Sequence, residues 1–107
     1  MLELLKAAGN YFPTKFDGVI RIEMDGAIDS IWVDGRVSPP SVSTKAPANL
    51  ASAFCLWRGQ KEIFARVFAL EERRLESAFI AGRVQISGDM SVMARLEPAE
   101  RGAASGV

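Results

Sequence analysis

The chain of 107 residues contains no histidine and only one cysteine, Cys55, so two common chemistries are missing. Histidine is the side chain that most often moves protons near neutral pH, and it is the most frequent zinc ligand. A single cysteine cannot form a disulfide within the chain. Cys55 lies between Phe54 and Leu56, where a thiol is expected to be buried and inert. The sequence therefore excludes a disulfide-stabilised secreted scaffold and a cysteine–histidine nucleophile.

An excess of charge of either sign is also missing. The 13 basic residues balance the 13 acidic residues, and the formal net charge is zero. Nucleic acids and anionic membranes are bound mainly through clustered basic residues, which this sequence lacks. We therefore expect no nucleic-acid partner, and any contact with a membrane is expected to be transient.

Long hydrophobic runs are absent as well. The first six residues carry charges within a run too short for a signal peptide, and no stretch approaches the length of a membrane span. With 49% hydrophobic and 24% charged residues, the composition is that of a folded protein, expected in the cytoplasm. The length fits one domain, which we expect at 1–98, followed by a flexible tail at 99–107 that has no apolar pattern.

The acidic residues and glycines are explained by turns and helix ends rather than by catalysis. Asp25 and Asp34 each precede a glycine in a turn, and Asp89 is placed to begin a helix. Gly82 and Gly88 are separated by a strand pattern, so they do not form a phosphate-binding loop. The sequence thus predicts no catalytic residues, no metal site, no cofactor and no enzymatic activity.

Alternating apolar residues predict a β-hairpin near the N-terminus. Residues 18–25 alternate, Asp25 and Gly26 favour a two-residue turn, and 27–34 form the returning strand. Trp32 falls on the opposite face from its two apolar neighbours in that strand. A strand that is apolar on both faces is either covered on both sides or lines a cavity with one of them.

The remaining segments predict an α+β fold. Prolines confine any strand near 42–44 to a sheet edge, whereas the apolar run at 51–57 fits a central strand. Helical periodicity is present at 2–8 and from 61 to 82, with a charged interruption at 71–74. Strands early in the chain and helices later favour an antiparallel sheet with helices on one face.

Glycines bracket a short strand in the last third of the chain. Gly82 is expected to end a helix in the left-handed conformation, with Phe79 at the end of that helix in the core. The strand at 83–87 should bury Val84 and Ile86 and leave its polar residues exposed. Asp89 should then act as the N-cap of a last short helix.

This segment, ESAFIAGRVQISGDMSVMARLE at 76–97, resembles the C-terminal signature of the sterol-carrier-protein type-two lipid-binding domains. In that family a helix ends in Ala-Phe-x-x-Gly, an alternating basic and aliphatic strand follows, and Gly-Asp/Asn-Met opens an apolar helix. The matching residues are Ala78, Phe79, Gly82, Arg83, Val84, Ile86, Gly88, Asp89, Met90, Ala94 and Leu96.

The resemblance implies a five-stranded, mainly antiparallel sheet layered with helices, and an apolar tunnel between them. It also implies non-catalytic binding or transfer of sterols, fatty acids, acyl chains or isoprenoid-like molecules. Apolar side chains on the expected helices and on the second face of the hairpin are the candidate lining of the tunnel. These lipid-binding candidates are Trp32, Phe54, Ile63, Phe64, Val67, Met90 and Met93.

Two other interpretations of the same residues stay open. The first is an accessory subunit that assists enzymes acting on lipophilic substrates such as quinone precursors, which requires a stable protein partner. The second is a structural domain or homodimer with a filled interior, because apolar side chains at helical spacing pack into a core more often than they line a ligand site.

Overall fold

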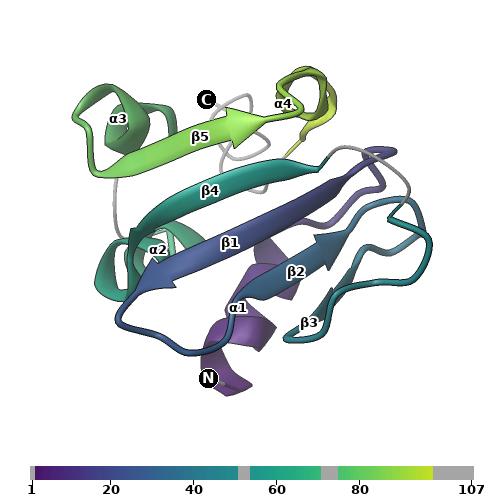
Figure 1. Ribbon diagram of the computed structural model, residues 1–107, viewed down its shortest axis with the longest axis horizontal. Helices are drawn as coiled ribbons and strands as arrows, with labels where there is room; N and C mark the ends of the chain where they lie inside the picture. The colour runs from purple at the N-terminus through teal and green to yellow at the C-terminus, as the bar shows by residue number, and fades with distance from the viewer. Residues whose placement is uncertain (1, 51–53, 71–74, 98–107) are drawn as a thin grey trace.

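The computed structural model describes residues 2–50, 54–70 and 75–97, which form one five-stranded sheet and four helices (Figure 1). The sheet consists of β1 (Val19–Asp25), β2 (Ile31–Asp34), β3 (Ser41–Ser43), β4 (Cys55–Gln60) and β5 (Val84–Gly88). The helices are α1 (Leu2–Tyr11), α2 (Lys61–Phe68), α3 (Leu75–Ile80) and α4 (Ser91–Arg95).

The strands lie in the order β3-β2-β1-β4-β5. Neighbouring pairs are antiparallel except β1 and β4, which run in parallel with Ile20 opposite Cys55 and Ile22 opposite Trp57. The sheet is therefore mixed and mainly antiparallel. The parallel pair joins the N-terminal meander β1-β2-β3 to the C-terminal strands β4 and β5.

The predicted hairpin forms, but its turn was predicted wrongly. Ile22 pairs with Ile31, and β2 begins only at Ile31, so the residues 26–30 connect the two strands. Gly26 has a positive φ of 80° within this longer connection. Ile28 lies fully exposed in it, which explains why a run rich in β-branched residues does not extend the strand.

Three further strands were predicted with shifted bounds. β3 confirms an edge strand near 42–44, and β5 confirms the strand at 83–87. β4 begins at Cys55 rather than at 51, and 51–53 lie outside the described residues. It continues through Gly59, where a side chain would meet the ring of Phe64 and the carbonyl of Arg83, the residue directly before β5. The sheet therefore needs glycine here so that α2 can start directly after β4.

One face of the sheet carries the core, as the alternation predicts. Every second residue of β1, β2 and β4 is buried there, and Val84 continues the row on β5 with Ile86 half-buried. Gln85 and Arg83 are exposed, as expected. The buried residues on this face of the sheet are Ile20, Ile22, Met24, Ile31, Val33, Cys55, Trp57 and Val84.

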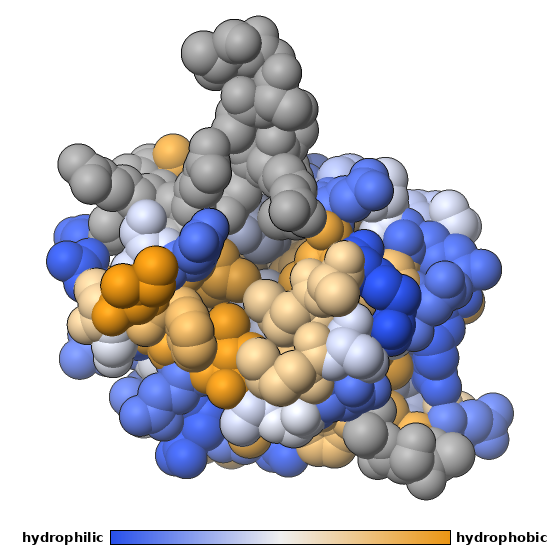
Figure 2. Space-filling model, turned by 90° about the horizontal axis from the view of Figure 1, so that it is seen from above, coloured by the Kyte–Doolittle hydropathy of each residue, from blue (hydrophilic) through white to orange (hydrophobic). Residues whose placement is uncertain are grey.

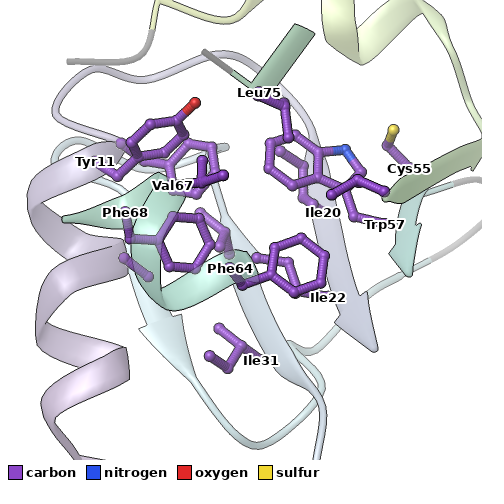
Figure 3. Close-up of a cluster of buried hydrophobic side chains, with 14 of the residues drawn as sticks. Tyr11, Ile20, Ile22, Ile31, Cys55, Trp57, Phe64, Val67, Phe68 and Leu75 are labelled. Carbon is purple, nitrogen blue, oxygen red and sulfur yellow. The ribbon is translucent and has the colours of Figure 1, made fainter. Parts of the chain in front are cut away.

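Helices α1 and α2 lie behind this face and contact each other (Figure 1). Between them and the sheet, aromatic rings pack closely. The ring centre of Phe12 lies 5.6 Å from that of Trp57 and 6.0 Å from that of Phe68. Phe64 stacks on Phe68 with ring centres 6.0 Å apart (Figure 3). Such contacts add to the hydrophobic stabilisation of a core. Among the described residues, aromatic side chains thus pack between these helices and the sheet.

The ends of α3 and α4 follow from local hydrogen bonds. Gly82, with φ of 78°, ends α3 because the N–H of Arg83 donates to the carbonyl of Ala78 and the N–H of Gly82 donates to that of Phe79. At the other end of β5, the Asp89 carboxylate accepts hydrogen bonds from the N–H and hydroxyl of Ser91. Asp89 thus supports the start of α4, although Met90 is the residue directly before the helix.

No helix among the described residues is long and apolar enough to cross a membrane. The residues 71–74 and the predicted tail at 99–107 lie outside the described part of the chain.

Candidate functional site

The seven candidate lipid-binding residues fall into three separate groups in the structure. Phe64 and Val67 are completely buried on α2 and belong to the core cluster, and Ile63 packs against that cluster while half-buried. They share one side of an amphipathic helix that faces the sheet. In this arrangement, these three residues contact the interior of the protein.

Trp32 and Phe54 form the second group, on the opposite face of the sheet. Ile31 and Val33 point into the core, so Trp32 between them points to the outer face. Its ring contacts Phe54 at 5.1 Å and lies 5.2 Å from the guanidinium of Arg21. Trp32 is only 9% exposed, so both faces of β2 are largely shielded from water, and the outer face also borders a surface hollow.

Met90 and Met93 form the third group, beside β5. Met90 is 49% exposed directly before α4, and Met93 is half-buried on α4 against the core. Helix α4 is held in place because the guanidinium of Arg95 donates hydrogen bonds to the carbonyl oxygens of Phe16 and Asp17. The two methionines are therefore placed by a fixed element, although their own side chains are adaptable.

Helix α3, at the other end of β5, also carries exposed apolar side chains. Phe79 is 43% exposed and Ile80 is 75% exposed, while Ile86 is half-buried on the strand that follows. Figure 2 shows hydrophobic surface gathered on the side where α3, β5 and α4 lie in Figure 1. We call this set, Phe79, Ile80, Ile86, Met90 and Met93, the α3–α4 face.

The exposure of Phe79 contradicts the prediction that it belongs to the core. Leu75 and Ala78 are the buried residues of α3, so the side of the helix that faces the protein is defined by a spacing of three residues. Phe79 and Ile80 continue the apolar run beyond that side. Three consecutive apolar residues, 78–80, in a helix of six residues were the signal that some of them must face outward.

Two surface hollows formed by described residues carry charged and polar side chains, and the second also has an apolar part. One, of about 290 Å³, is lined by Arg58, Arg83 and Gln85 at the end of β4 and the start of β5. The other, of about 210 Å³, lies beside Trp32 and includes Ser41, Ser43 and Lys45. Neither lining is suited to a long hydrocarbon chain.

The titratable groups of the described residues show no arrangement typical of catalysis. Burial raises the pKa of the Cys55 thiol, against the smaller opposite effect of the Trp57 indole N–H. That N–H faces Cys55 in Figure 3 and has no hydrogen bond of normal geometry among the described residues. Cys55 is fully buried, as predicted. No group of three or more His, Cys, Asp or Glu residues that could hold a metal ion occurs in the described segments.

No protein-family model and no curated protein matches the sequence. Solved structures do match. Sterol carrier protein 2 from Yarrowia lipolytica is 16% identical, with a TM-score of 0.55 over 88% of this chain and 74% of that chain. Sterol carrier protein 2 like 2 from Aedes aegypti is 18% identical, with a TM-score of 0.54 over 87% of this chain and 86% of that chain.

A third match is described as the UbiJ-SCP2 ubiquinone synthesis protein. It is 14% identical, with a TM-score of 0.49 over 97% of this chain and 74% of that chain. The two stronger matches establish the α+β fold of the sterol carrier protein 2 domains for this chain, in agreement with the resemblance in its last third.

Proposed function

We propose that this chain, which has the fold of the sterol carrier protein 2 domains, reversibly binds a lipid or another long apolar molecule and does not transform it. The observation that carries the proposal is the α3–α4 face. Phe79, Ile80 and Met90 are all more than 40% exposed on the segments that flank β5, and Ile86 and Met93 are half-buried. Exposed apolar side chains gathered in one place mark sites of interaction.

The chemistry of this face suits a hydrocarbon chain of variable shape. Methionine has three rotatable bonds and a polarisable sulfur, so Met90 and Met93 can adapt to different ligands. Arg95, the nearest basic residue on α4, already donates to two backbone carbonyls. We therefore expect the polar head group to stay near the surface and selectivity among apolar chains to be weak.

The energetics of apolar burial set the expected affinity. Each fully buried methylene contributes about 0.8 kcal/mol, and loss of translational and rotational freedom costs about 4 kcal/mol or more. A hydrocarbon chain on an exposed face is only partly buried, so we expect weak binding, which a fluorescence assay with excess protein can measure.

The test is displacement of a fluorescent fatty acid, combined with native mass spectrometry of protein purified without detergent. Ile80→Lys places a charge on the α3–α4 face and should weaken probe binding by about tenfold or more, because a charged side chain replaces apolar contact area. Ile28→Lys is the matched control, because Ile28 is equally apolar and fully exposed but lies in the connection between β1 and β2. It should leave the affinity unchanged.

Met93→Lys extends the test to a half-buried position and should weaken binding further, provided that its circular dichroism spectrum is unchanged. Equal binding by Ile80→Lys and Ile28→Lys would refute this location of the site. Absence of both co-purified lipid and probe binding would refute lipid binding itself.

The second candidate function is that of an accessory subunit. Phe79 and Ile80 project from the surface of α3, and projecting apolar side chains suit a protein partner as well as a lipid. An enzyme partner, or a second copy of this chain, would then cover the α3–α4 face. This candidate predicts that Ile80→Lys abolishes a stable complex, seen by sedimentation, and that Ile28→Lys does not.

A further inference from the structure

The hollow beside Trp32 lies on the outer face of the sheet, away from the α3–α4 face. Trp32 pairs with Ser43 across β2 and β3, and Asp34 pairs with Ser41, so these four residues lie on the same face of two neighbouring strands. Lys45 and Pro47, from the segment after β3, complete the wall. We call this space of about 210 Å³ the Trp32 hollow.

The aromatic wall of this hollow is fixed before any ligand arrives. Phe54 contacts Trp32 in an edge-to-face arrangement with an interplanar angle of 63°. The guanidinium of Arg21 lies 5.2 Å from the centre of the Trp32 ring, a distance at which a cation is attracted to an indole. Because Trp32 is only 9% exposed, a small part of its ring is available to a ligand, and that part is held rigidly, at little cost in conformational entropy on binding.

The opposite wall is held by Arg36. Its guanidinium donates to both carboxylate oxygens of Asp34, at 2.8 and 3.0 Å, and to the carbonyl oxygens of Ala48 and Asn49, each at 2.8 Å. This one side chain therefore ties the segment 44–50 to the end of β2. The N–H of Lys45 also donates to the hydroxyl oxygen of Ser43, which turns the chain directly after β3.

The charged group of the hollow that is free to bind a ligand is positive. The hydrogen bond from Arg36 lowers the pKa of Asp34, so this carboxylate stays ionised and paired with Arg36. Lys45 forms no ion pair with a carboxylate in the described segments. The hydroxyl of Ser43 accepts the N–H of Lys45, which leaves its own hydrogen free to donate.

The size restricts the ligand to a small molecule. A cavity of about 150 Å³ accommodates benzene, so about 210 Å³ holds one ring with a substituent of a few atoms. An indole wall favours a flat aromatic ring, and an unpaired ammonium beside a hydroxyl donor favours an anionic substituent. We propose that the Trp32 hollow binds a small aromatic carboxylate, with the ring against Trp32 and the carboxylate at Lys45 and Ser43.

This site is independent of the proposed lipid binding, because the Trp32 hollow and the α3–α4 face have no residue in common. NMR titration of the full chain with benzoate tests it. The protein has two tryptophans, and Trp57 is fully buried in the core, so the two indole N–H signals report separate places. We expect a saturable shift of the Trp32 signal with a dissociation constant in the millimolar range, and no shift of the Trp57 signal.

Three further ligands test the contributions of the negative charge and of the aromatic ring separately. Benzamide lacks the charge, cyclohexanecarboxylate lacks the aromatic ring, and acetate lacks a ring altogether; each should bind at least about threefold more weakly than benzoate. Lys45→Gln should reduce benzoate binding to the level of benzamide, whereas Lys45→Arg should retain it. Lys61→Gln is the control, an exposed lysine on α2.

Unchanged benzoate binding by Lys45→Gln would overturn the proposal, as would a larger shift at Trp57 than at Trp32. Ile80→Lys should bind benzoate normally, and Lys45→Gln should bind the fluorescent fatty acid normally. A loss of both activities in either variant would contradict the separation of the two sites.

Discussion

Phe64 and Phe79 have opposite environments although both lie on helices in the second half of the chain. Phe64 is completely buried and contacts Phe68, whereas 43% of Phe79 is exposed on α3. The hydrophobic contribution of a side chain depends on the area that folding removes from water. The two rings should therefore contribute very differently to the free energy of unfolding.

We predict that Phe64→Ala lowers the free energy of unfolding by about 3–5 kcal/mol, because it leaves a cavity inside a packed aromatic cluster. Phe79→Ala should lower it by only about 1 kcal/mol, since part of the ring is already in water. Urea denaturation followed by tryptophan fluorescence measures both. Equal losses for the two variants would show that Phe79 is part of the core after all.

At the level of elements, β5 is bounded by two glycines with left-handed backbones but different surroundings. Gly82 has φ of 78° and open space where a side chain would be, whereas Gly88 has φ of 82° and the carbonyl oxygen of Phe54 lies too close to that position for a side chain to fit. The same carbonyl accepts the N–H of Asp89, so moving it away would break a hydrogen bond that fixes the end of β5.

Gly82→Ala should therefore lower the free energy of unfolding by about 1–2 kcal/mol, the cost of a left-handed backbone for a residue with a side chain. Gly88→Ala should cost at least about 1 kcal/mol more, because the steric conflict is added to the same backbone strain. Thermal or urea denaturation measures the difference. Equal stability of the two variants would show that the Phe54 carbonyl leaves room for a side chain at residue 88.

The sequence predicted those features that depend on local chemistry. The alternation in β1 and β5 and the left-handed Gly82 follow from side-chain period and backbone freedom, and each is present. The parallel pairing of β1 with β4 could not be predicted in this way, because it joins segments about 35 residues apart with no turn between them to fix the register.

The arrangement of the candidate site residues could not be predicted from the sequence, for a related reason. Hydrophobicity identifies Trp32, Phe64 and Met90 as apolar, but their separation onto the outer face, the core and the β5 side depends on the tertiary fold. Phe79 was assigned to the core because helical periodicity does not reveal how much of a short helix its neighbours can cover. The hollow beside Trp32 depends on the ties from Arg36 to Ala48 and Asn49, which no sequence pattern indicates.

At the scale of the whole molecule, the reactivity of the Cys55 thiol can be used to measure how often the sheet opens. It is the only cysteine, is fully buried, and lies on β4, which pairs with both β1 and β5. Burial also raises the pKa of its thiol, so the reactive thiolate is suppressed in the folded state. A reagent can reach this sulfur only when the central strands separate.

We predict that alkylation of Cys55 is slower in the native protein than in the urea-unfolded protein by orders of magnitude, with a rate that follows the unfolded fraction as urea increases. Mass spectrometry of iodoacetamide-treated samples measures this. Phe64→Ala should accelerate labelling in proportion to its loss of stability. Rapid labelling of the native protein without urea would mean that β4 opens locally, apart from the rest of the sheet.

The position of the parallel β1–β4 pair has a consequence for biosynthesis. The meander β1-β2-β3 comprises residues 19–43, so a ribosome completes it before it produces β4, which starts at residue 55. Until then, the hydrogen-bonding edge of β1 that later receives β4 has no partner strand, and such an edge can pair with other chains. Closing the long connection between β1 and β4 also carries an entropic cost that slows this step. The nascent chain is therefore most prone to aggregate after β3 has been made and before β4 docks, and the seam between the two halves of the sheet is the place where a chaperone would have most effect.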